Sequence, residues 1–161
     1  MDLAVPEGVK LLLPLLCLLA SQSRVTLRGH DARGHWFDLT SQRGHAVAIT
    51  FGSRRTEKEA RVINDELAKH VQVVNVVDLR GVPDIAHDLA KKKICESDGP
   101  RLFHLVDPDG QIARGFAVDP QHHVDIFLVD GSGHLMGHYL DHEGVAQVEA
   151  RLRPKHLGRR R

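Results

Sequence analysis

Cysteine is the first residue type that could give this protein a chemical activity, and the small number of cysteines limits which thiol reactions are possible. The chain has 161 residues and two cysteines, Cys17 and Cys95. Cys95 follows three lysines at 91–93, whose charges would favour a thiolate if they were close. It also lies at the end of an expected helix, where the helix dipole disfavours an anion. Cys95 is therefore a candidate for one-cysteine peroxidase chemistry, with a structural or incidental thiol as the alternative.

Histidine is the second chemically active residue type, because the chain contains 12 of them. His134, His138 and His142 are four residues apart, but on an extended strand each such step spans about 13 Å, too far for one metal ion. His122 and His123 are adjacent and precede an apolar run, so they are the better candidates for metal ligands. The alternative is that both are solvated loop residues.

The composition is that of a single globular domain. Apolar residues make up 42% of the chain and charged residues 27%, enough to build a core and to solvate it. Lys and Arg number 22 against 21 Asp and Glu, and this near balance argues against a specific or general nucleic-acid binder. Two cysteines are too few for a four-cysteine zinc module or a disulfide scaffold.

The first 23 residues are expected to be a signal peptide. Residues 11–20, LLLPLLCLLA, form an apolar run that is too short for a membrane span, since a transmembrane helix needs about 20 such residues. Position and length suit the core of a leader, which predicts a periplasmic or secreted protein. An uncleaved or lipid-anchored leader and a buried N-terminal helix are the alternatives. Once a leader is removed, Cys95 is the one remaining thiol and no intramolecular disulfide can form.

Strands and helices are expected to alternate over residues 24–153. Apolar runs and turn formers predict strands at 25–29, 35–39, 46–52 and 71–79. Helical spacing predicts helices at 56–70 and 84–94, and a last helix with Val145, Val148 and Leu152 on one face. Residues 154–161 belong to a basic tail that we expect to be solvated, with contact to anionic lipid or nucleic acid as the alternative.

Two local patterns add detail to this outline. Thr56 and Glu59 fit a capping box at the start of the 56–70 helix. Residues 103–116 and 126–139 share LVDxxG around tight-turn sequences, so each is expected to be a strand-turn-strand unit.

The order of these elements, hairpin, βαβ, helix, hairpin and helix, resembles that of a thioredoxin fold. Residues 31–51 resemble the opening of the thiol-specific antioxidant and TlpA-like proteins, and LVDPDGQIARGFAV, from Leu105, resembles a peroxiredoxin segment. GSRRTEKEA, from Gly52, is similar to the uncharacterised periplasmic YtfJ-type family at the place of the redox motif. The resemblance, which covers about residues 25 to 153, implies an α/β thioredoxin-like fold with a central mixed sheet, flanking helices and an N-terminal β-hairpin.

The same resemblance shows which chemistry is missing. Thioredoxin-like enzymes place the attacking thiolate at the N-terminus of the first helix after a buried strand, where the dipole stabilises the anion. This chain has Thr56, Glu57, Lys58 and Glu59 there, and neither cysteine of a C-x-x-C pair. Disulfide exchange at this helix is therefore excluded. A hydroxyl without an adjacent activating base also makes Thr56 a poor nucleophile.

These observations predict an exported thioredoxin-fold protein that binds a protein or peptide partner without catalysis, as an adaptor of the cell envelope. The expected binding face comprises Gly52, Arg54, Arg55, Thr56 and Glu59. Two adjacent arginines at a helix N-terminus also form a plausible anion site, because guanidinium groups and backbone donors point the same way. No cofactor is expected.

Two alternatives assign an activity. One is a peroxiredoxin-like peroxidase that uses Cys95. The other is metal carriage, because the copper-binding Sco proteins, which are also thioredoxin-like, place a ligand histidine near the positions of His122 and His123. Their two cysteine ligands correspond here to Thr56 and Ala60, so a copper(I) site would lose its soft ligands.

Overall fold

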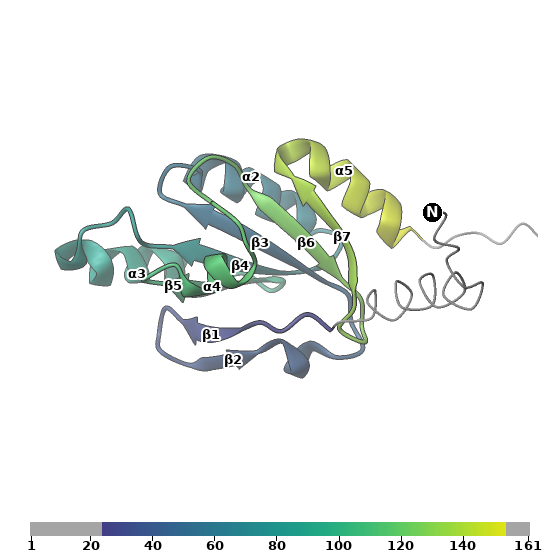
Figure 1. Ribbon diagram of the computed structural model, residues 1–161, viewed down its shortest axis with the longest axis horizontal. Helices are drawn as coiled ribbons and strands as arrows, with labels where there is room; N and C mark the ends of the chain where they lie inside the picture. The colour runs from purple at the N-terminus through teal and green to yellow at the C-terminus, as the bar shows by residue number, and fades with distance from the viewer. Residues whose placement is uncertain (1–23, 154–161) are drawn as a thin grey trace, which may run out of the picture.

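A seven-stranded mixed sheet forms the middle of the molecule (Figure 1). The computed structural model describes residues 24–153, and the strand order is β2-β1-β5-β4-β3-β6-β7. Strands β3, β4 and β5 are parallel to one another, and the other neighbouring pairs are antiparallel. The strands are β1 (Arg28–Asp31), β2 (Trp36–Asp38), β3 (Val47–Ser53), β4 (Gln72–Asp78), β5 (Leu102–Asp107), β6 (Asp125–Val129) and β7 (Leu135–Leu140).

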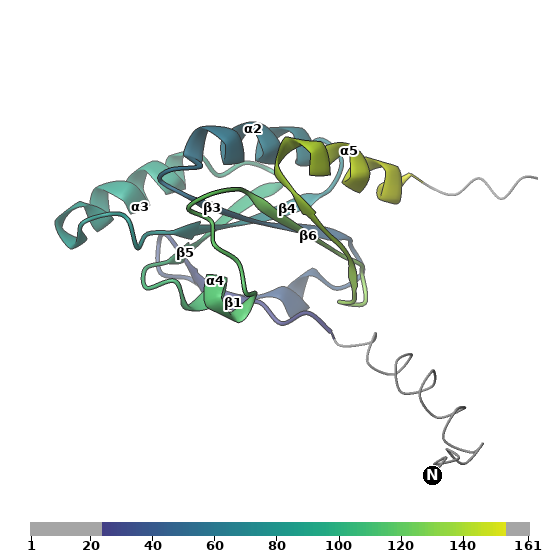
Figure 2. The same ribbon diagram turned by 45° about the horizontal axis from the view of Figure 1, so that its top comes forward.

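Helices cover the sheet unequally, as Figure 2 shows. Helices α2 (Glu57–Leu67), α3 (His87–Glu96) and α5 (Asp141–Leu152) lie on one face. The short helix α4 (Gln111–Gly115) and the β1–β2 hairpin lie on the other. Two 3-10 turns, η1 (Leu39–Gln42) and η2 (Asp84–Ala86), complete the elements of residues 24–153. This architecture is the thioredoxin-like α/β fold that the sequence predicts, including its N-terminal hairpin.

The core consists of two apolar clusters, one on each face of the sheet. Every residue of β3 is buried, which explains why its sequence is an almost continuous apolar run. Phe51, Phe116 and Phe127 pack together on the α4 face, with ring centroids 5.0 to 5.8 Å apart. Ile63 and Val148 belong to the cluster beneath α2 and α5.

Helix α2 lies close against the sheet because of one glycine and one polar network. A Cβ atom on Gly52 would stand 3.0 Å from the Cβ of Ala60, so a larger residue there would push the helix away. The buried hydroxyl oxygen of Thr50 lies 2.7 Å from Oδ1 of Asn64 on α2 and 3.0 Å from Oδ1 of Asn75 on β4, and its one proton can be donated to either amide oxygen. These contacts fix both the height and the rotation of α2.

The repeated LVDxxG segments fold differently, so one prediction is confirmed and the other is wrong. Residues 126–139 form the expected hairpin, β6–β7. In 103–116 the strand β5 is followed by α4 and not by a second strand. The buried carboxylate of Asp107 is the reason, because it accepts hydrogen bonds from the backbone N–H groups of Ile112 (3.2 Å) and Ala113 (2.9 Å) and so organises the first turn of α4.

The predicted signal peptide (1–23) and basic tail (154–161) lie outside the described residues. Within 24–153, no helix combines the length and the apolar character needed to cross a membrane.

Replacing Asp107 by Ala is expected to lower the free energy of unfolding by about 3 kcal/mol, because one buried and one partly buried N–H group would lose a charged acceptor. Denaturant unfolding measures this. Asp109→Ala is the matched control, since the exposed Asp109 carboxylate bonds only its neighbour Gln111, and its effect should stay within about 0.5 kcal/mol. Equal losses in the two variants would contradict the role assigned to Asp107.

Candidate binding face at the carboxyl edge of the sheet

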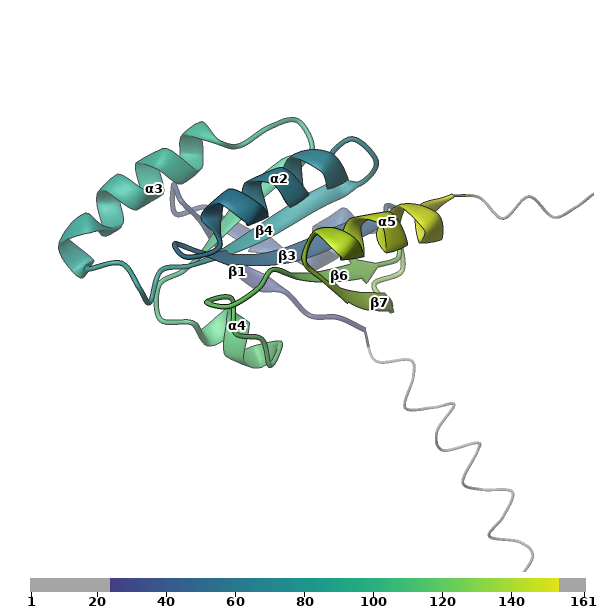
Figure 3. The ribbon, with the colours of Figure 1, turned by 90° about the horizontal axis from the view of Figure 1, so that it is seen from above.

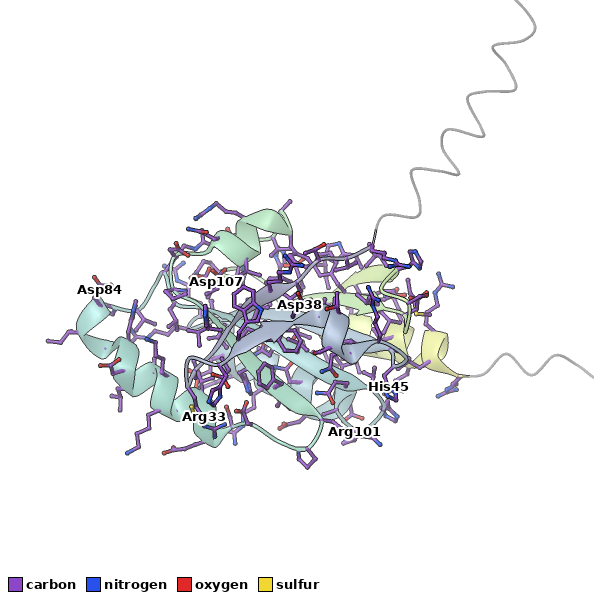
Figure 4. The ribbon with its side chains drawn as sticks, turned by 90° about the horizontal axis from the view of Figure 1, so that it is seen from below. Arg33, Asp38, His45, Asp84, Arg101 and Asp107 are labelled. Atoms are coloured by element: carbon purple, nitrogen blue, oxygen red, sulfur yellow. The ribbon has the colours of Figure 1, made fainter. Side chains whose placement is uncertain are left out.

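The N-terminus of α2 lies at the carboxyl edge of the sheet, the edge at which β3, β4 and β5 end at Ser53, Asp78 and Asp107. Figure 4 views the molecule from the hairpin side and labels Asp107 at this edge and Arg101, which precedes β5, at the opposite, amino edge. Helices that follow parallel strands begin at the carboxyl edge, so their N-terminal N–H groups gather here. This is the place where the sequence predicts a binding face.

Thr56 connects three segments at this edge. Its Oγ1 accepts a hydrogen bond from the Ser53 N–H (2.9 Å) and donates one to the Pro120 carbonyl (3.0 Å). The Thr56 side chain is buried, so the end of β3, the start of α2 and the loop before β6 are held together by one hydroxyl.

The capping box predicted for Thr56 and Glu59 is wrong, although α2 begins where it was expected. Thr56 is the N-cap residue, but its backbone (φ −101°, ψ 9°) is not in the extended conformation that lets a side chain reach back to the helix N–H groups. Its hydroxyl faces Ser53 and Pro120 and makes no cap hydrogen bond. The Thr56 hydroxyl therefore bonds to the distant Pro120 carbonyl and not to the N–H groups of the first helical turn.

The five residues of the predicted face divide into a buried support and an exposed surface. Gly52 and Thr56 are buried and position the backbone, whereas Arg54, Arg55 and Glu59 are exposed. The Arg55 N–H donates to the Ser53 hydroxyl (3.2 Å), which shapes the turn that carries both arginines. The accessible part of the face is thus the arginine pair and the first turn of α2.

Asp78 and Arg80 form a second charged group at this edge that the sequence analysis missed. Arg80 Nε lies 3.1 and 3.0 Å from the two Asp78 carboxylate oxygens, and a terminal guanidinium nitrogen lies 2.7 Å from Oδ2. Burial alone would raise the pKa of Asp78, but the hydrogen bonds and charge of Arg80 outweigh it and hold the pKa below its ordinary value. A carboxylate at the end of a buried strand, followed two residues later by arginine, was the signal available in the sequence.

The loop before β6 closes over both groups. Its Pro120 carbonyl binds Thr56, and the Gln121 side-chain amide donates to Asp78 Oδ2 (3.3 Å). Ala117, near the start of this loop, adopts a positive φ of 56°, an uncommon conformation for a residue with a Cβ atom. The loop therefore has a defined path along the carboxyl edge.

His122 and His123 are adjacent in this loop but lie near different carboxylates. His122 Nε2 lies 3.6 Å from Asp119, whereas His123 Nε2 lies 3.5 Å from Oδ2 of the buried Asp125. His138, on β7, bonds the other Asp125 oxygen at 2.7 Å and stacks on Phe127. The structure thus pairs His123 with His138 across one carboxylate, and their use as metal ligands stays a prediction.

Cys95 lies away from the arginine pair. It is partly buried in the last turn of α3, and because β5 starts at the amino edge soon after α3, this turn lies toward that edge. The N-terminus of α2 is at the opposite edge. The structure therefore does not bring the chain's candidate thiol to the position where the resemblance places a peroxidatic cysteine.

Comparison with known proteins supports the fold and no closer relationship. No family model matches the chain, and no curated protein matches it. A putative thiol:disulfide interchange protein DsbE from Chlorobium tepidum superposes with a TM-score of 0.61 at 19% identity, covering 82% of this chain and 96% of that one. The exposed lipoprotein thioredoxin Etrx1 of Streptococcus pneumoniae gives 0.57 at 17% identity, with 80% and 98% covered. Yeast Sco1 with copper bound gives 0.54 at 14% identity, with 86% and 97% covered.

Replacing Arg80 by Gln is expected to destabilise the fold in a pH-dependent way. Near pH 7 the loss should be about 2–3 kcal/mol, because the Asp78 carboxylate stays buried without its main partner. Since the pKa of Asp78 is lowered in the folded state, the stabilisation exists above the pKa of the unfolded chain and disappears as pH falls through the folded value. The difference between Arg80→Gln and wild type should therefore shrink below about pH 4.

Urea unfolding at several pH values measures this difference. Arg61→Gln, an exposed arginine on α2, is the control and should show a small effect at every pH. A loss in Arg80→Gln that stays constant from pH 7 to pH 3 would assign the effect to packing and contradict the ion-pair interpretation.

Proposed function

We propose that this protein is a non-catalytic binding module of the cell envelope, an adaptor with a thioredoxin-like fold that recognises a protein or peptide partner through the carboxyl edge of its sheet. Within that fold we place it nearest to the YtfJ-type proteins, on the likeness of the GSRRTEKEA stretch. A thioredoxin-like fold alone does not assign an activity, so the proposal depends on the residues at the site.

The observation that carries the proposal is the hydrogen bonding of the buried Thr56 hydroxyl. This residue stands where the resemblance places redox chemistry, and its hydroxyl already accepts from Ser53 and donates to Pro120. A buried hydroxyl engaged in two hydrogen bonds is unsuited to nucleophilic attack. Within residues 24–153 the cysteine is Cys95, which lies away from this helix, and this supports a binding role for the edge.

The exposed arginines define the chemistry of the partner. Arg54 and Arg55 precede the positive end of α2, and guanidinium groups bind carboxylates in a bidentate manner. Glu57 and Glu59 follow in the first turn, where acidic side chains favour the helix, so the arginines provide the positive charge that faces outward. An acidic peptide segment is the partner that this surface suits.

The envelope location has two supports. The apolar run at 11–20 has the length and position of a signal-peptide core. The structural neighbours include an exposed lipoprotein of Streptococcus pneumoniae and a secreted disulfide oxidoreductase of Mycobacterium tuberculosis. These two locations are those of the neighbouring proteins. For this chain, the envelope location is part of the proposal.

Reversing both charges in Arg54→Glu/Arg55→Glu is expected to weaken binding of an acidic peptide by about tenfold or more, because two charge-assisted contacts would become repulsive. The probe is a blocked octapeptide of alternating Glu and Gly, titrated at low salt and followed by backbone amide NMR shifts. In the wild-type chain the shifts should gather at residues 53–59 and 119–123.

Two further variants make this experiment specific. Arg101→Glu/Arg151→Glu makes the same charge reversal at exposed positions toward the opposite, amino edge and should reduce the affinity much less. Cys95→Ser should bind like wild type, since the proposal uses no thiol. Shifts centred elsewhere, or equal weakening by the two charge-reversal pairs, would reject the carboxyl edge as the binding face.

A further inference from the structure

A second group of chemically active side chains lies at the other end of α2. Glu66, His70 and Glu149 each offer a ligand atom, and these three atoms all lie within 4.8 Å of one another. Glu66 is in the last turn of α2, His70 follows one turn later, and Glu149 is in the last turn of α5. Figure 3 shows α2 and α5 side by side and running in the same direction, so their C-terminal ends meet at the amino edge.

The backbone that carries these three side chains is well supported. Glu66 and His70 are four residues apart, the spacing that places two side chains on one helix face. The turn after α2 continues its hydrogen bonding, since the His70 N–H donates to the Leu67 carbonyl (2.9 Å). Beneath the cluster, Ile63 and Leu67 of α2 pack in the same apolar core as Val148 of α5. The ligand atoms are therefore brought together by the fold.

The spacing of the atoms fits a metal ion. His70 Nε2 and Glu149 Oε1 are 3.4 Å apart. A tetrahedral ion with ligand bonds of about 2.1 Å separates its ligand atoms by about 3.4 Å, so these two atoms already have the required spacing. The Glu66 ligand atom lies within 4.8 Å of the other two, so this carboxylate would have to move closer and give up its hydrogen bond with Lys69 to join the ion.

The charge around the cluster also favours a cation. The C-terminal ends of two helices meet there, and each carries a partial negative charge. The cluster already attracts one cation, because the Lys69 ammonium lies 2.5 Å from Glu66 Oε2. The same contact is a hydrogen bond from the Lys69 ammonium to the Glu66 carboxylate. Lys69 therefore competes for one of the ligands.

We propose that Glu66, His70 and Glu149 form a binding site for a divalent first-row transition ion, with Zn²⁺ as its representative and water completing the coordination. One imidazole and two carboxylates suit Zn²⁺ and its neighbours, whereas Cu⁺ prefers sulfur ligands. The site is separate from His122 and His123 and does not rest on the proposed partner binding. An ion bound here joins the end of α2 to the end of α5, and its function is to hold the two helices together.

The test is calorimetric titration of the untagged chain with Zn²⁺ at pH 7.5, together with the melting temperature with and without the ion. Wild type should bind one ion at this site and melt several degrees higher with it, since an ion bound to the folded state stabilises that state. His70→Ala and Glu149→Gln should each weaken this binding by about 100-fold or more. Lys69→Ala should tighten it, because Glu66 would lose its competing cation.

Matched controls separate this site from the other histidines. His30→Ala alters an exposed histidine of the β1–β2 hairpin, on the other face of the sheet, and should leave Zn²⁺ binding unchanged, as should His122→Ala/His123→Ala. Absence of Zn²⁺ binding in wild type, or wild-type affinity in both His70→Ala and Glu149→Gln, would overturn the proposal.

Discussion

The position of α2 on the sheet is the constraint on which both candidate sites depend. The helix approaches β3 closely because Gly52 leaves room for Ala60. It cannot rotate freely, because the Thr50 hydroxyl lies between the amides of Asn64 and Asn75 inside the core. A buried polar network is satisfied in few arrangements, and any other would leave a polar group unpaired. Because α2 is fixed in this way, the side chains at both of its ends have defined positions.

Much of the fold could be predicted from the sequence because its signals are local. The all-apolar run that becomes β3 and the helical spacing of Ala60, Ile63 and Leu67 each reflect burial on a known face. A local sequence pattern did not predict the structure where similar segments fold differently. The two LVDxxG segments look alike, and only the hydrogen bonds of the buried Asp107 show that the first of them leads into a helix.

The candidate sites were less accessible to prediction, because their decisive contacts join distant residues. Thr56 suggested a local cap, whereas its hydroxyl binds Pro120, 64 residues later. The pairing of His70 with Glu149 arises from the packing of α2 against α5, and no spacing in the sequence indicates it. The Asp78–Arg80 pair is the exception, because only one residue separates its members and sequence reasoning could have found it.

The direction of α2 relates the two sites to each other. A helix dipole is positive at the N-terminus and negative at the C-terminus, whatever side chains surround it. In thioredoxin-like enzymes the positive end stabilises a thiolate. In this chain Thr56 stands at that end and the exposed Arg54 and Arg55 precede it, so the same field adds to the attraction that the proposed anion site requires. The opposite end meets the C-terminus of α5, and there the same field favours a cation between Glu66, His70 and Glu149. The polarity of α2 thus suits the two proposed sites, an anion at its N-terminus and a cation at its C-terminus.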